Sequence, residues 1–387
     1  MFELAAALDQ RRADGAWRER HALAAMHGPA VERDGRRLVN FCGNDYLGLA
    51  ADRAVVAALI AAARRYGVGS GAAQLVTGYS DEHAVLEREL AAFTGREAAL
   101  LFPSGWMANQ GAIGALLGRG DAVFCDRLNH ASLIDAARAS GARFVRYRHC
   151  DPDDLAARLA ATPARRRLIV TDAVFSMDGD RAPLAALAAL SRQHDAWLMV
   201  DDAHGFGVLG AGGAGSLEAA GLGQRDVPVL MATLGKAVGV AGAFVAGSRE
   251  LTDTLTQFAR SFIYTTAPPP ALAAAARAAI TAIRTRPELR AGLAGNVARF
   301  RARAAAAGIE LSPSQTPIQP ILLGSNERAL EASRELAEAG FLVTAIRPPT
   351  VPAGSARLRV TLSTAHTHGQ IDAFVAALGE VLAALPT

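Results

Sequence analysis

Seven short apolar runs, separated by helical stretches, restrict the fold of this chain more than any other feature of its sequence. Strands that are apolar along their whole length and alternate with helices typically form a parallel sheet covered on both faces. Only a short glycine-rich link joins the last two runs, which predicts one antiparallel pair at an edge. We therefore expect an α/β fold with a mostly parallel seven-stranded sheet. The runs are Ala98–Phe102, Ala122–Cys125, Arg143–Tyr147, Leu168–Val174, Trp197–Asp202, Val229–Leu234 and Ala243–Gly247.

The residues outside this alternation predict a divided chain. The first forty residues look like a helix followed by a hairpin with an Asp-Gly turn at Asp34 and Gly35. The alternation ends at the Ala-Pro-Pro-Pro sequence of 267–270, and a long helix and a smaller α+β segment follow it. The strands expected in that segment lie near Ile318–Leu323, Phe341–Ala345 and Arg357–Leu362. The expected parts are an N-terminal segment, 1–50, that packs with the small domain, a large domain, 51–270, and a C-terminal small domain, 271–387.

Composition excludes several classes of protein. Hydrophobic residues make up 51% of the 387 residues and charged residues 20%, which is typical of a globular protein with a large core. The net charge of +3 is spread along the chain, so it does not indicate nucleic acid, although it is compatible with an anionic substrate or cofactor. The three cysteines lack disulfide or metal-ligand spacing, which favours a reducing compartment. Without a secretory signal or a run of about 18 apolar residues, we expect a soluble cytoplasmic protein.

Polar groups of different chemistry follow five of the expected strands. Ligands of a parallel sheet gather beyond the carboxyl ends of its strands, so we expect these groups to share one edge. Each group has an ordinary structural interpretation by itself, such as a helix cap or a turn, but a merely structural sheet does not need all five. In strand order they are Ser104 with Gly105, His130, Ser176, Asp201 with His204, and Lys236.

Lys236 stands among glycines, alanines and valines in the run TLGKAVGVAGA, Thr233–Ala243. Lysine is rarely buried unless it is paired or used. Loss of water disfavours its charged form, and a neutral amine is a nucleophile and a base. Lys236 is therefore a candidate covalent catalyst, and a snorkelling surface lysine is the alternative.

Other common site types fit these residues less well. Asp201, Asp202 and His204 have no further histidine or cysteine at a ligand spacing, and His366 and His368 lie in a Thr/Gly-rich segment that favours the surface, so we predict no metal site. The glycines after His204 do not follow the first strand of a βαβ unit, as a dinucleotide fingerprint would. Neither a G-x-S-x-G sequence nor a P-loop is present.

One cofactor, pyridoxal phosphate, has needs that match the strand ends. It requires a lysine for a Schiff base, a carboxylate that keeps its pyridine nitrogen protonated, a site for its phosphate and a flat group against its ring. Lys236 meets the first need and Asp201 the second. The N-terminus of the helix that opens near Gly105 and Trp106 meets the third, and His130 meets the fourth.

Four segments resemble those of a known enzyme family, namely NFCGNDYLGL at 40–49, FSMDGD at 175–180, MVDDAHGFGVLG at 199–210 and TLGKAVGVAGA at 233–243. Over nearly its whole length the chain is similar to the α-oxoamine synthases. These pyridoxal-phosphate enzymes of fold type I join an amino acid to an acyl thioester with loss of carbon dioxide. NDYLGL and the segment Ala345–Leu362 look most like the biotin-pathway branch, which uses L-alanine and a pimeloyl thioester of coenzyme A or of acyl carrier protein.

The resemblance implies a role for each residue around the cofactor ring. Lys236 would bind the cofactor covalently and, once displaced by L-alanine, would remove the α-proton of that substrate. Asp201 would pair with the pyridine nitrogen. His204 would bond the phenolic oxygen, with Ser176 close by, and His130 would stack on the ring.

The resemblance also implies the phosphate contacts and a homodimer. The amides of Gly105 and Trp106 and the hydroxyl of Thr233 would bind the phosphate. Thr265 and Thr266 would reach the phosphate of the neighbouring subunit, so that the two subunits would share their active sites.

For the substrates, the resemblance implies two pairs of residues. Asn44 and Arg359 would hold the amino-acid carboxylate, and Arg18 and Thr350 would contact the acyl substrate. The sequence departs from the family at Gln74, where other members often carry arginine or histidine, which leaves the contacts of this loop open.

Three other functions compete with this interpretation. A sister synthase that uses glycine or serine with another acyl-CoA is the first, because one methyl group changes pocket discrimination by at most a few kcal/mol. A catalytically silent subunit is the second, and the presence of both Lys236 and Asp201 disfavours it. A nicotinamide-dependent oxidoreductase is the third, and the missing fingerprint disfavours it.

Overall fold

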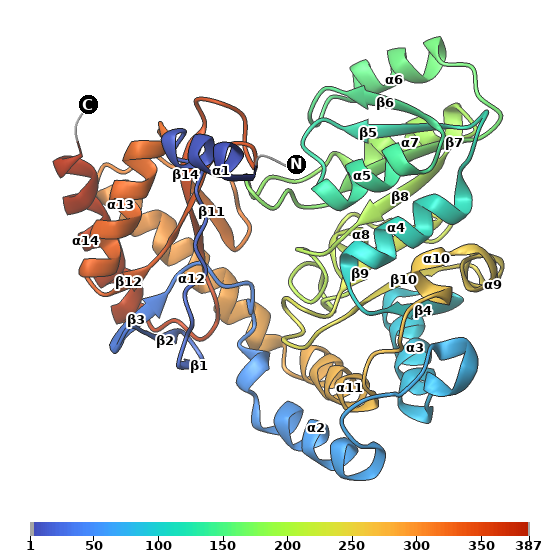
Figure 1. The fold of residues 1–387 in the computed structure, drawn as a ribbon, viewed down its shortest axis with the longest axis horizontal. Coiled ribbons are helices and arrows are strands. Elements are labelled where there is room, and N and C mark those ends of the chain that lie inside the picture. Colours follow the sequence, from blue (N-terminus) through green and yellow to red (C-terminus); the bar gives the residue numbers. More distant parts are fainter. Residues whose placement is uncertain (1–3, 386–387) are drawn as a thin grey trace. The chain divides into compact units, whose positions relative to one another are not determined.

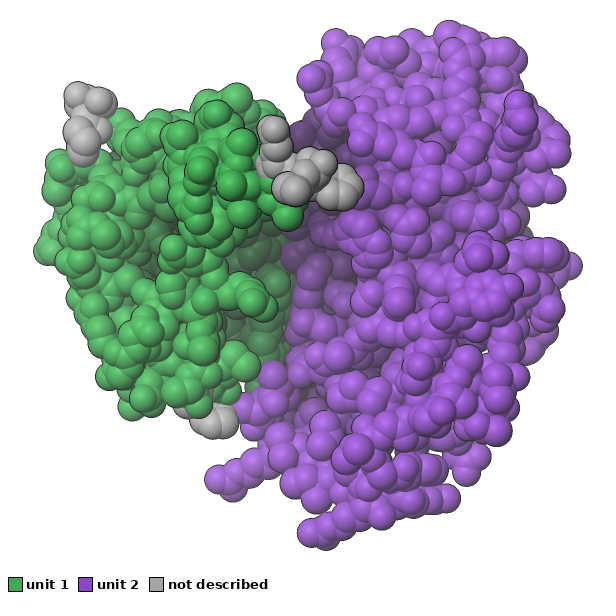
Figure 2. Space-filling view, viewed as in Figure 1, with its two compact units in different colours: residues 1–48, 177–180, 291–387 green, residues 49–176, 181–290 purple. Residues whose placement is uncertain are grey.

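The computed structural model describes residues 4–385 and divides the chain into two compact units (Figure 2). The larger unit consists of residues 49–176 and 181–290. The smaller unit consists of residues 1–48, 177–180 and 291–387, of which 4–48, 177–180 and 291–385 are described. No helix within the described range is both long enough and apolar enough to cross a lipid bilayer.

A seven-stranded sheet in the order β4-β10-β9-β8-β7-β5-β6 forms the centre of the larger unit (Figure 1). All seven strands coincide, within a residue or two at their ends, with the apolar runs of the sequence. Their bounds are β4 Ala98–Phe102, β5 Ala122–Asp126, β6 Arg143–Tyr147, β7 Arg167–Asp172, β8 Trp197–Asp201, β9 Val229–Thr233 and β10 Ala243–Gly247.

The antiparallel strand does not lie at the edge that the sequence analysis predicted. β10 pairs antiparallel with β9 on one side and with β4 on the other, so it lies inside the sheet and all the other strands point the same way. The short link between β9 and β10 correctly indicated a hairpin. It could not show that β4, the first strand of the unit, pairs with the other side of β10 and forms the edge of the sheet.

Helices cover both faces of this sheet, as its apolar strands require. In β5, Val123 and Cys125 join one core, which includes side chains from α4, α5, α9 and α10, whereas Ala122 and Phe124 join a second core with α6, α7 and α8. Alternate residues of a strand point to opposite faces, so a strand that is apolar throughout needs helices packed on both faces of the sheet. These helices are α4 Gly105–Leu116, α5 Ala131–Ala139, α6 Pro152–Ala161, α7 Leu184–Gln193, α8 Ser216–Ala219, α9 Arg249–Phe258 and α10 Arg260–Ile263.

The boundary predicted near residue 270 is wrong by about twenty residues, because α11 belongs to the larger unit and the division falls inside α12, after Arg290. α11 packs against α2 and α3 and buries Ala276, Ile280 and Ile283, so the Ala-Pro-Pro-Pro sequence begins a helix of the same core. The remaining elements here are η1 Leu49–Ala51, α2 Arg53–Tyr66, η2 Gln74–Gly78, α3 Asp81–Thr94, α11 Pro270–Thr285 and α12 Pro287–Ala306.

The smaller unit contains two sheets, in the orders β1-β2-β3-β12 and β11-β14-β13. The predicted hairpin is present, with both Asp34 and Gly35 at positive φ, as an Asp-Gly hairpin turn requires. The single strand expected at Phe341–Ala345 is two strands, because β12 pairs parallel with β3 while β13 pairs antiparallel with β14. The elements are α1 Leu4–Ala13, β1 Ala25–His27, β2 Ala30–Arg33, β3 Arg36–Asn40, β11 Ile318–Gly324, α13 Asn326–Glu338, β12 Phe341–Leu342, β13 Thr344–Ile346, β14 Ala356–Thr361 and α14 His368–Ala384.

His366 is a core residue of the smaller unit and not the surface residue that its neighbours in the sequence suggested. It is buried and stacked on Phe41 with ring centroids 4.1 Å apart. Its Nδ1 accepts a hydrogen bond from the Ser363 amide, and its Nε2 donates to the carbonyl of Asn40. Both ring nitrogens are therefore used in structural bonds.

Residues 177–180 leave the larger unit and form part of the smaller one. The carbonyl of Gly179 accepts hydrogen bonds of 2.9 Å from the hydroxyls of Ser314 and Thr316, and Asp178 pairs with Arg357 at 2.5 Å. Gly179 has φ +71°, and a Cβ there would lie 2.3 Å from the carbonyl oxygen of Ile318. A side chain at this position would therefore prevent the segment from docking.

Candidate active site

The strand ends of the larger unit place an amine beside an imidazole. Lys236 follows β9, His204 follows the neighbouring strand β8, and their Nζ and Nε2 atoms are 2.9 Å apart. While the amine is protonated it can only donate, so Nε2 of His204 accepts. His204 is buried and Lys236 is half-buried, which separates this contact from bulk water.

A sequence fact sharpens the role of this amine. Lys236 is the only lysine of the chain, so 39 of its 40 basic Lys and Arg residues are arginines. Arginine supplies positive charge equally well, but it does not lose its proton in proteins, whereas a lysine amine can. The single lysine therefore stands at a position where an amine that can lose its proton would be of use.

The carboxylate of Asp201 ends β8 and is held by two donors. Its Oδ1 accepts from the Ala203 amide at 3.0 Å, and its Oδ2 accepts from Nδ2 of Asn109 at 2.9 Å. Asp201 is only 3% exposed. A buried carboxylate in a fixed orientation at a sheet edge is suited to pair with one cationic group of a ligand.

Asn109, on α4, connects Asp201 to His130. Its Nδ2 also donates to the hydroxyl of Ser132 at 2.9 Å, and that hydroxyl lies 2.7 Å from Nδ1 of His130. The sequence analysis did not identify Asn109 or Ser132. A polar side chain on the apolar face of a helix, one turn after Gly105, is the signal that could have found Asn109.

His130 caps the N-terminus of α5 and presents a neutral ring. His130 is exposed on one side, but the loss of water around its ring is the main cause that lowers its pKa; the charge of Asp201 opposes this shift, and the charge of Lys236 adds to it. Its backbone amide donates to the carboxyl of Asp172 at 2.7 Å. A neutral flat ring held at both its backbone and its Nδ1 can stack on a planar ligand.

Asp172, the last residue of β7, lies opposite Asp201 in the sheet register. Burial raises the pKa of Asp172 well above its ordinary value, and the nearby charge of Asp201 raises it further. Two carboxyl groups this close disfavour simultaneous ionisation. The raised pKa of Asp172 therefore favours its neutral form beside Asp201.

The N-terminus of α4 presents backbone amides at the same sheet edge. Ser104 caps this helix by accepting from the Met107 amide at 3.2 Å. The amides of Gly105 and Trp106 begin the helix, where backbone N–H groups have no intrahelical acceptor. They are available to an anion.

Thr233 lies at the end of β9, and its hydroxyl bonds the Gly242 carbonyl at 3.0 Å. Ser176 is half-buried in the loop after β7. Thr265 and Thr266 lie between α10 and α11, and Thr266 pairs with Ala73 in an isolated bridge. Among the described residues, no recorded contact joins either threonine to the Lys236 group.

The predicted substrate residues form two groups in the smaller unit. Arg359 of β14 is buried, and its guanidinium donates to Oδ1 of Asn44 at 3.2 Å. Arg18 donates to the hydroxyl of Thr350 at 3.1 Å. The structure therefore brings together each pair that the sequence analysis grouped.

Arg347 adds a third cation that the sequence analysis missed. Its guanidinium donates to the carbonyls of Gly15 and Trp17, and so fixes the backbone that leads into Arg18. Burial lowers the pKa of Arg347, and the charge of Arg18 lowers it further. Two neighbouring guanidinium groups suit an anionic ligand.

The structure shows what the side chain of Gln74 contacts. Gln74 begins η2 and is buried, and its Nε2 donates to the carbonyl of Leu101 in β4 at 3.0 Å. This side chain holds its own loop against the sheet.

The sequence DDAHGFG also contains a buried carboxyl that titrates near neutrality. Asp202 is fully buried, and Ser216 donates to it through its hydroxyl at 2.5 Å and its amide at 2.6 Å. A Cβ at Gly205 would lie 2.2 Å from Oδ1 of Asp202, which explains the glycine. Burial raises the pKa of Asp202 to about 7.

This raised pKa predicts a pH dependence of stability. Because the folded protein holds the Asp202 proton more tightly than the unfolded chain, its contribution is full below about pH 4 and is lost as the pH rises through about 7. We expect the melting temperature of Asp202→Asn to fall less between pH 5 and pH 8 than that of the wild type. Thermal unfolding at both values measures this, and equal slopes for the two proteins would contradict it.

Comparison with known proteins agrees with this geometry. Residues 36–378 match the model of the family "Aminotransferase class I and II". The chain is 60% identical to the 8-amino-7-oxononanoate synthase of Alkalilimnicola ehrlichii, with 98% of this chain and 97% of the relative covered. It is 57% identical to the synthase of Methylococcus capsulatus, with 98% of each chain covered. The chain belongs to the family of the 8-amino-7-oxononanoate synthases.

Solved structures of related enzymes show the same fold. Serine palmitoyltransferase from S. paucimobilis, solved with PLP bound, has a TM-score of 0.93 and 30% identity, with 99% of this chain and 98% of that chain covered. The 8-amino-7-oxononanoate synthase of Francisella tularensis has a TM-score of 0.78 and 31% identity, with 89% and 98% covered. The fold is that of the PLP-dependent transferases, and pyridoxal phosphate is the cofactor of this family.

Proposed function

We propose that this enzyme condenses L-alanine with a pimeloyl thioester and releases carbon dioxide and free thiol, forming 8-amino-7-oxononanoate for biotin biosynthesis. The observation that carries the proposal is that the sole lysine, 2.9 Å from His204, and the buried carboxylate of Asp201 lie at the ends of two neighbouring strands. The 60% identity to a synthase of this name, over nearly the whole chain, supports the choice of reaction.

The described residues fit pyridoxal phosphate. The amine of Lys236 is placed to bind it covalently, and Asp201, anchored by Ala203 and Asn109, can hold the proton on its pyridine nitrogen. When bound, this cofactor withdraws electrons from the α-carbon of the amino acid that it carries. The role of Asp201 requires a carboxylate, and the raised pKa of Asp172 favours a neutral neighbour beside it.

The remaining contacts with the cofactor divide between its ring and its phosphate. His130 would stack on the ring, and His204, with Ser176 close by, would donate to the phenolic oxygen. The phosphate would be held by three groups at two strand ends, which are the amides of Gly105 and Trp106 and the hydroxyl of Thr233.

Lys236 has a second task once alanine displaces it. Its Nζ takes the α-proton of the substrate, and later returns a proton to the product. A positioned general base typically contributes about 10²–10⁴ to the rate. His204, at 2.9 Å, limits the directions in which this amine can point.

We assign the substrate anions to the arginines of the smaller unit. Arg359 and Asn44 would bind the carboxylate of alanine. Arg18 and Thr350 would contact the acyl substrate, and Arg347, which holds the backbone before Arg18, would keep that guanidinium in position.

We also propose a homodimer in which Thr265 and Thr266 contribute to the phosphate site of the neighbouring subunit. Such an interface would bury apolar and aromatic side chains of the larger unit that are exposed in the single chain. They are Val68, Leu75, Val76, Tyr79 and Tyr264. Free thiols at all three cysteines fit the reducing cytoplasm, where we place the enzyme.

The test of the function is a substrate comparison with the purified enzyme. We expect carbon dioxide and free thiol to form at equal rates with L-alanine and pimeloyl-CoA or pimeloyl-acyl carrier protein, and mass spectrometry to identify 8-amino-7-oxononanoate. Glycine and serine, tested with acetyl-, succinyl- and palmitoyl-CoA, are the controls. A higher kcat/KM for any of these pairs than for alanine with both pimeloyl thioesters would overturn the proposal in favour of a sister synthase.

A further inference from the structure

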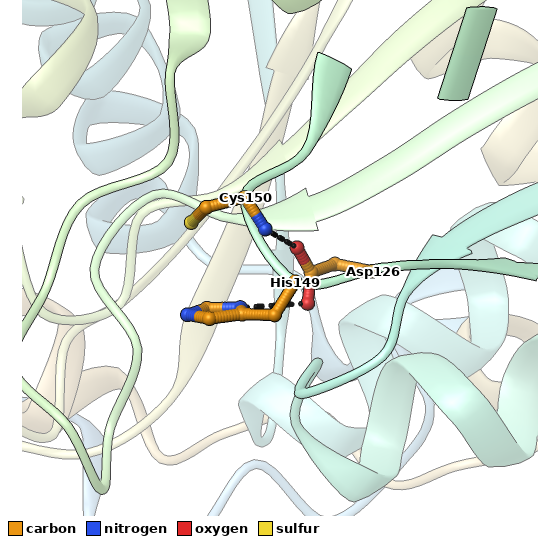
Figure 3. A group of neighbouring side chains, drawn as sticks. All are labelled: Asp126, His149 and Cys150. Carbon is orange, nitrogen blue, oxygen red and sulfur yellow. Dashed lines mark hydrogen bonds and ion pairs between the residues drawn. The ribbon is translucent and has the colours of Figure 1, made fainter. Parts of the chain in front are cut away.

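Three side chains outside the cofactor group converge at the ends of two adjacent strands (Figure 3). Asp126 is the last residue of β5, and His149 and Cys150 follow β6, which pairs with β5 in parallel. One ligand atom from each residue, a carboxylate oxygen, an imidazole nitrogen and the thiol sulfur, lies within 4.8 Å of the other two. None of the three belongs to the candidate active site described above.

The carboxylate organises this cluster. Asp126 is 1% exposed, and its Oδ1 accepts from Nδ1 of His149 at 2.9 Å and from the Leu128 amide at 2.8 Å. Its Oδ2 accepts from the Cys150 amide at 2.8 Å. The edge of the imidazole packs on Phe175, with ring centroids 4.4 Å apart. One carboxylate therefore holds the ring of His149 and the backbone of Cys150, while the Cys150 thiol itself donates to the carbonyl of Arg181 at 3.7 Å.

Cys150 adopts a backbone conformation that is uncommon for a residue with a side chain. Its φ is +49°, in the left-handed region that costs a residue other than glycine roughly 1 kcal/mol or more. Glycine would adopt this turn without that cost. The position instead carries a thiol, which lies beside a buried carboxylate and an imidazole.

The charges distinguish two uses of such a thiol. A reactive nucleophile needs its thiolate stabilised, and the neighbouring carboxylate of Asp126 does the opposite. A divalent cation removes this conflict because it compensates both negative groups. Sulfur, imidazole nitrogen and carboxylate oxygen together are typical ligands of zinc.

The distances also allow zinc. For three atoms within 4.8 Å of one another, a point exists at most about 2.8 Å from each. Zinc binds sulfur at about 2.3 Å and nitrogen or oxygen at about 2.0–2.2 Å. Side-chain movements of less than about 1 Å would therefore complete three coordination bonds.

We propose that Asp126, His149 and Cys150 bind one Zn²⁺ ion, with water as the fourth ligand. Binding releases the thiol proton to solvent and moves the imidazole proton from Nδ1 to Nε2, so that the sulfur and Nδ1 can coordinate. The thiolate, the carboxylate and the ion then sum to zero charge. This site is independent of the proposed reaction.

The test is a calorimetric titration of the wild-type holoenzyme with zinc chloride in a buffer without added thiols. We expect one equivalent to bind at about 10 µM free zinc or below. Cys150→Ser should lose this equivalent, and the matched control Cys42→Ser should keep it. Circular dichroism and the absorbance of the bound cofactor establish that each variant is folded.

A second measurement needs no variant. Zinc should protect Cys150 from alkylation, as read by peptide mass spectrometry, and leave the half-buried Cys42 as reactive as before. X-ray absorption at the zinc edge should show one sulfur ligand. Absence of a bound equivalent, a Cys150→Ser variant that still binds it, or alkylation of Cys150 that zinc does not slow would each overturn the proposal.

Discussion

Replacing Lys236 by alanine is expected to abolish covalent attachment of pyridoxal phosphate and to lower turnover by more than the 10²–10⁴-fold that a general base typically supplies. The loss should be larger than that range because the same amine both holds the cofactor and moves the substrate proton. The fold should persist, since Lys236 is only half-buried and does not belong to the apolar cores of the larger unit.

The absence of any other lysine makes the measurement unusually direct. Borohydride reduction of the holoenzyme should fix the cofactor on one proteolytic peptide, which contains Lys236. Lys236→Arg is the matched control, because it keeps the positive charge but not an amine that can react. An arginine variant with substantial activity, or a cofactor fixed to any other residue, would refute the assignment.

The second large effect is expected at Asp201. Asp201→Asn should lower kcat by at least about a hundredfold, which corresponds to about 2.7 kcal/mol of transition-state stabilisation. A neutral amide cannot hold the proton on the cofactor's pyridine nitrogen. The amide must also leave an oxygen facing the Ala203 amide, which turns its NH₂ group toward the NH₂ of Asn109, so a modest fall in melting temperature should accompany the loss.

Asp172→Asn provides the control for this prediction. Asp172 is also buried at the end of a neighbouring strand, but its raised pKa favours the protonated form, and asparagine resembles a protonated aspartate in shape and charge. We expect this variant to retain activity within a few-fold of the wild type. Steady-state kinetics on both variants measure the contrast. Equal losses at the two positions would show that the charge assignment is wrong.

The strands of the larger unit were predictable because each is apolar on both faces. Such strands must be buried on both faces, and a parallel sheet with helices on each face is the usual fold that buries them. The internal position of β10 was not predictable, because the order of strands depends on which side chains pack across the sheet. β12 and β13 come from one apolar run of the sequence. They are separate strands because β12 pairs with β3 of one sheet and β13 pairs with β14 of the other.

The part of the candidate site that lies at the carboxyl ends of the strands was predictable. The residues after β4, β5, β7, β8 and β9 were found because they carry chemically distinctive side chains. Asn109, Ser132 and Arg347 were missed because they act through hydrogen bonds to other residues, and such bonds leave no spacing in a sequence. His149 and Cys150 follow β6, so the same rule would have found them if it had been applied to that strand.

The parallel pairing of β3 with β12 has a consequence for synthesis on the ribosome. These strands are separated by about 300 residues, so the partner of β3 is made long after β3 itself. At about 5–20 residues per second, the first hairpin waits roughly 15–60 s with one edge open. Nascent chains should therefore remain vulnerable to aggregation and depend on chaperones until β12 has emerged.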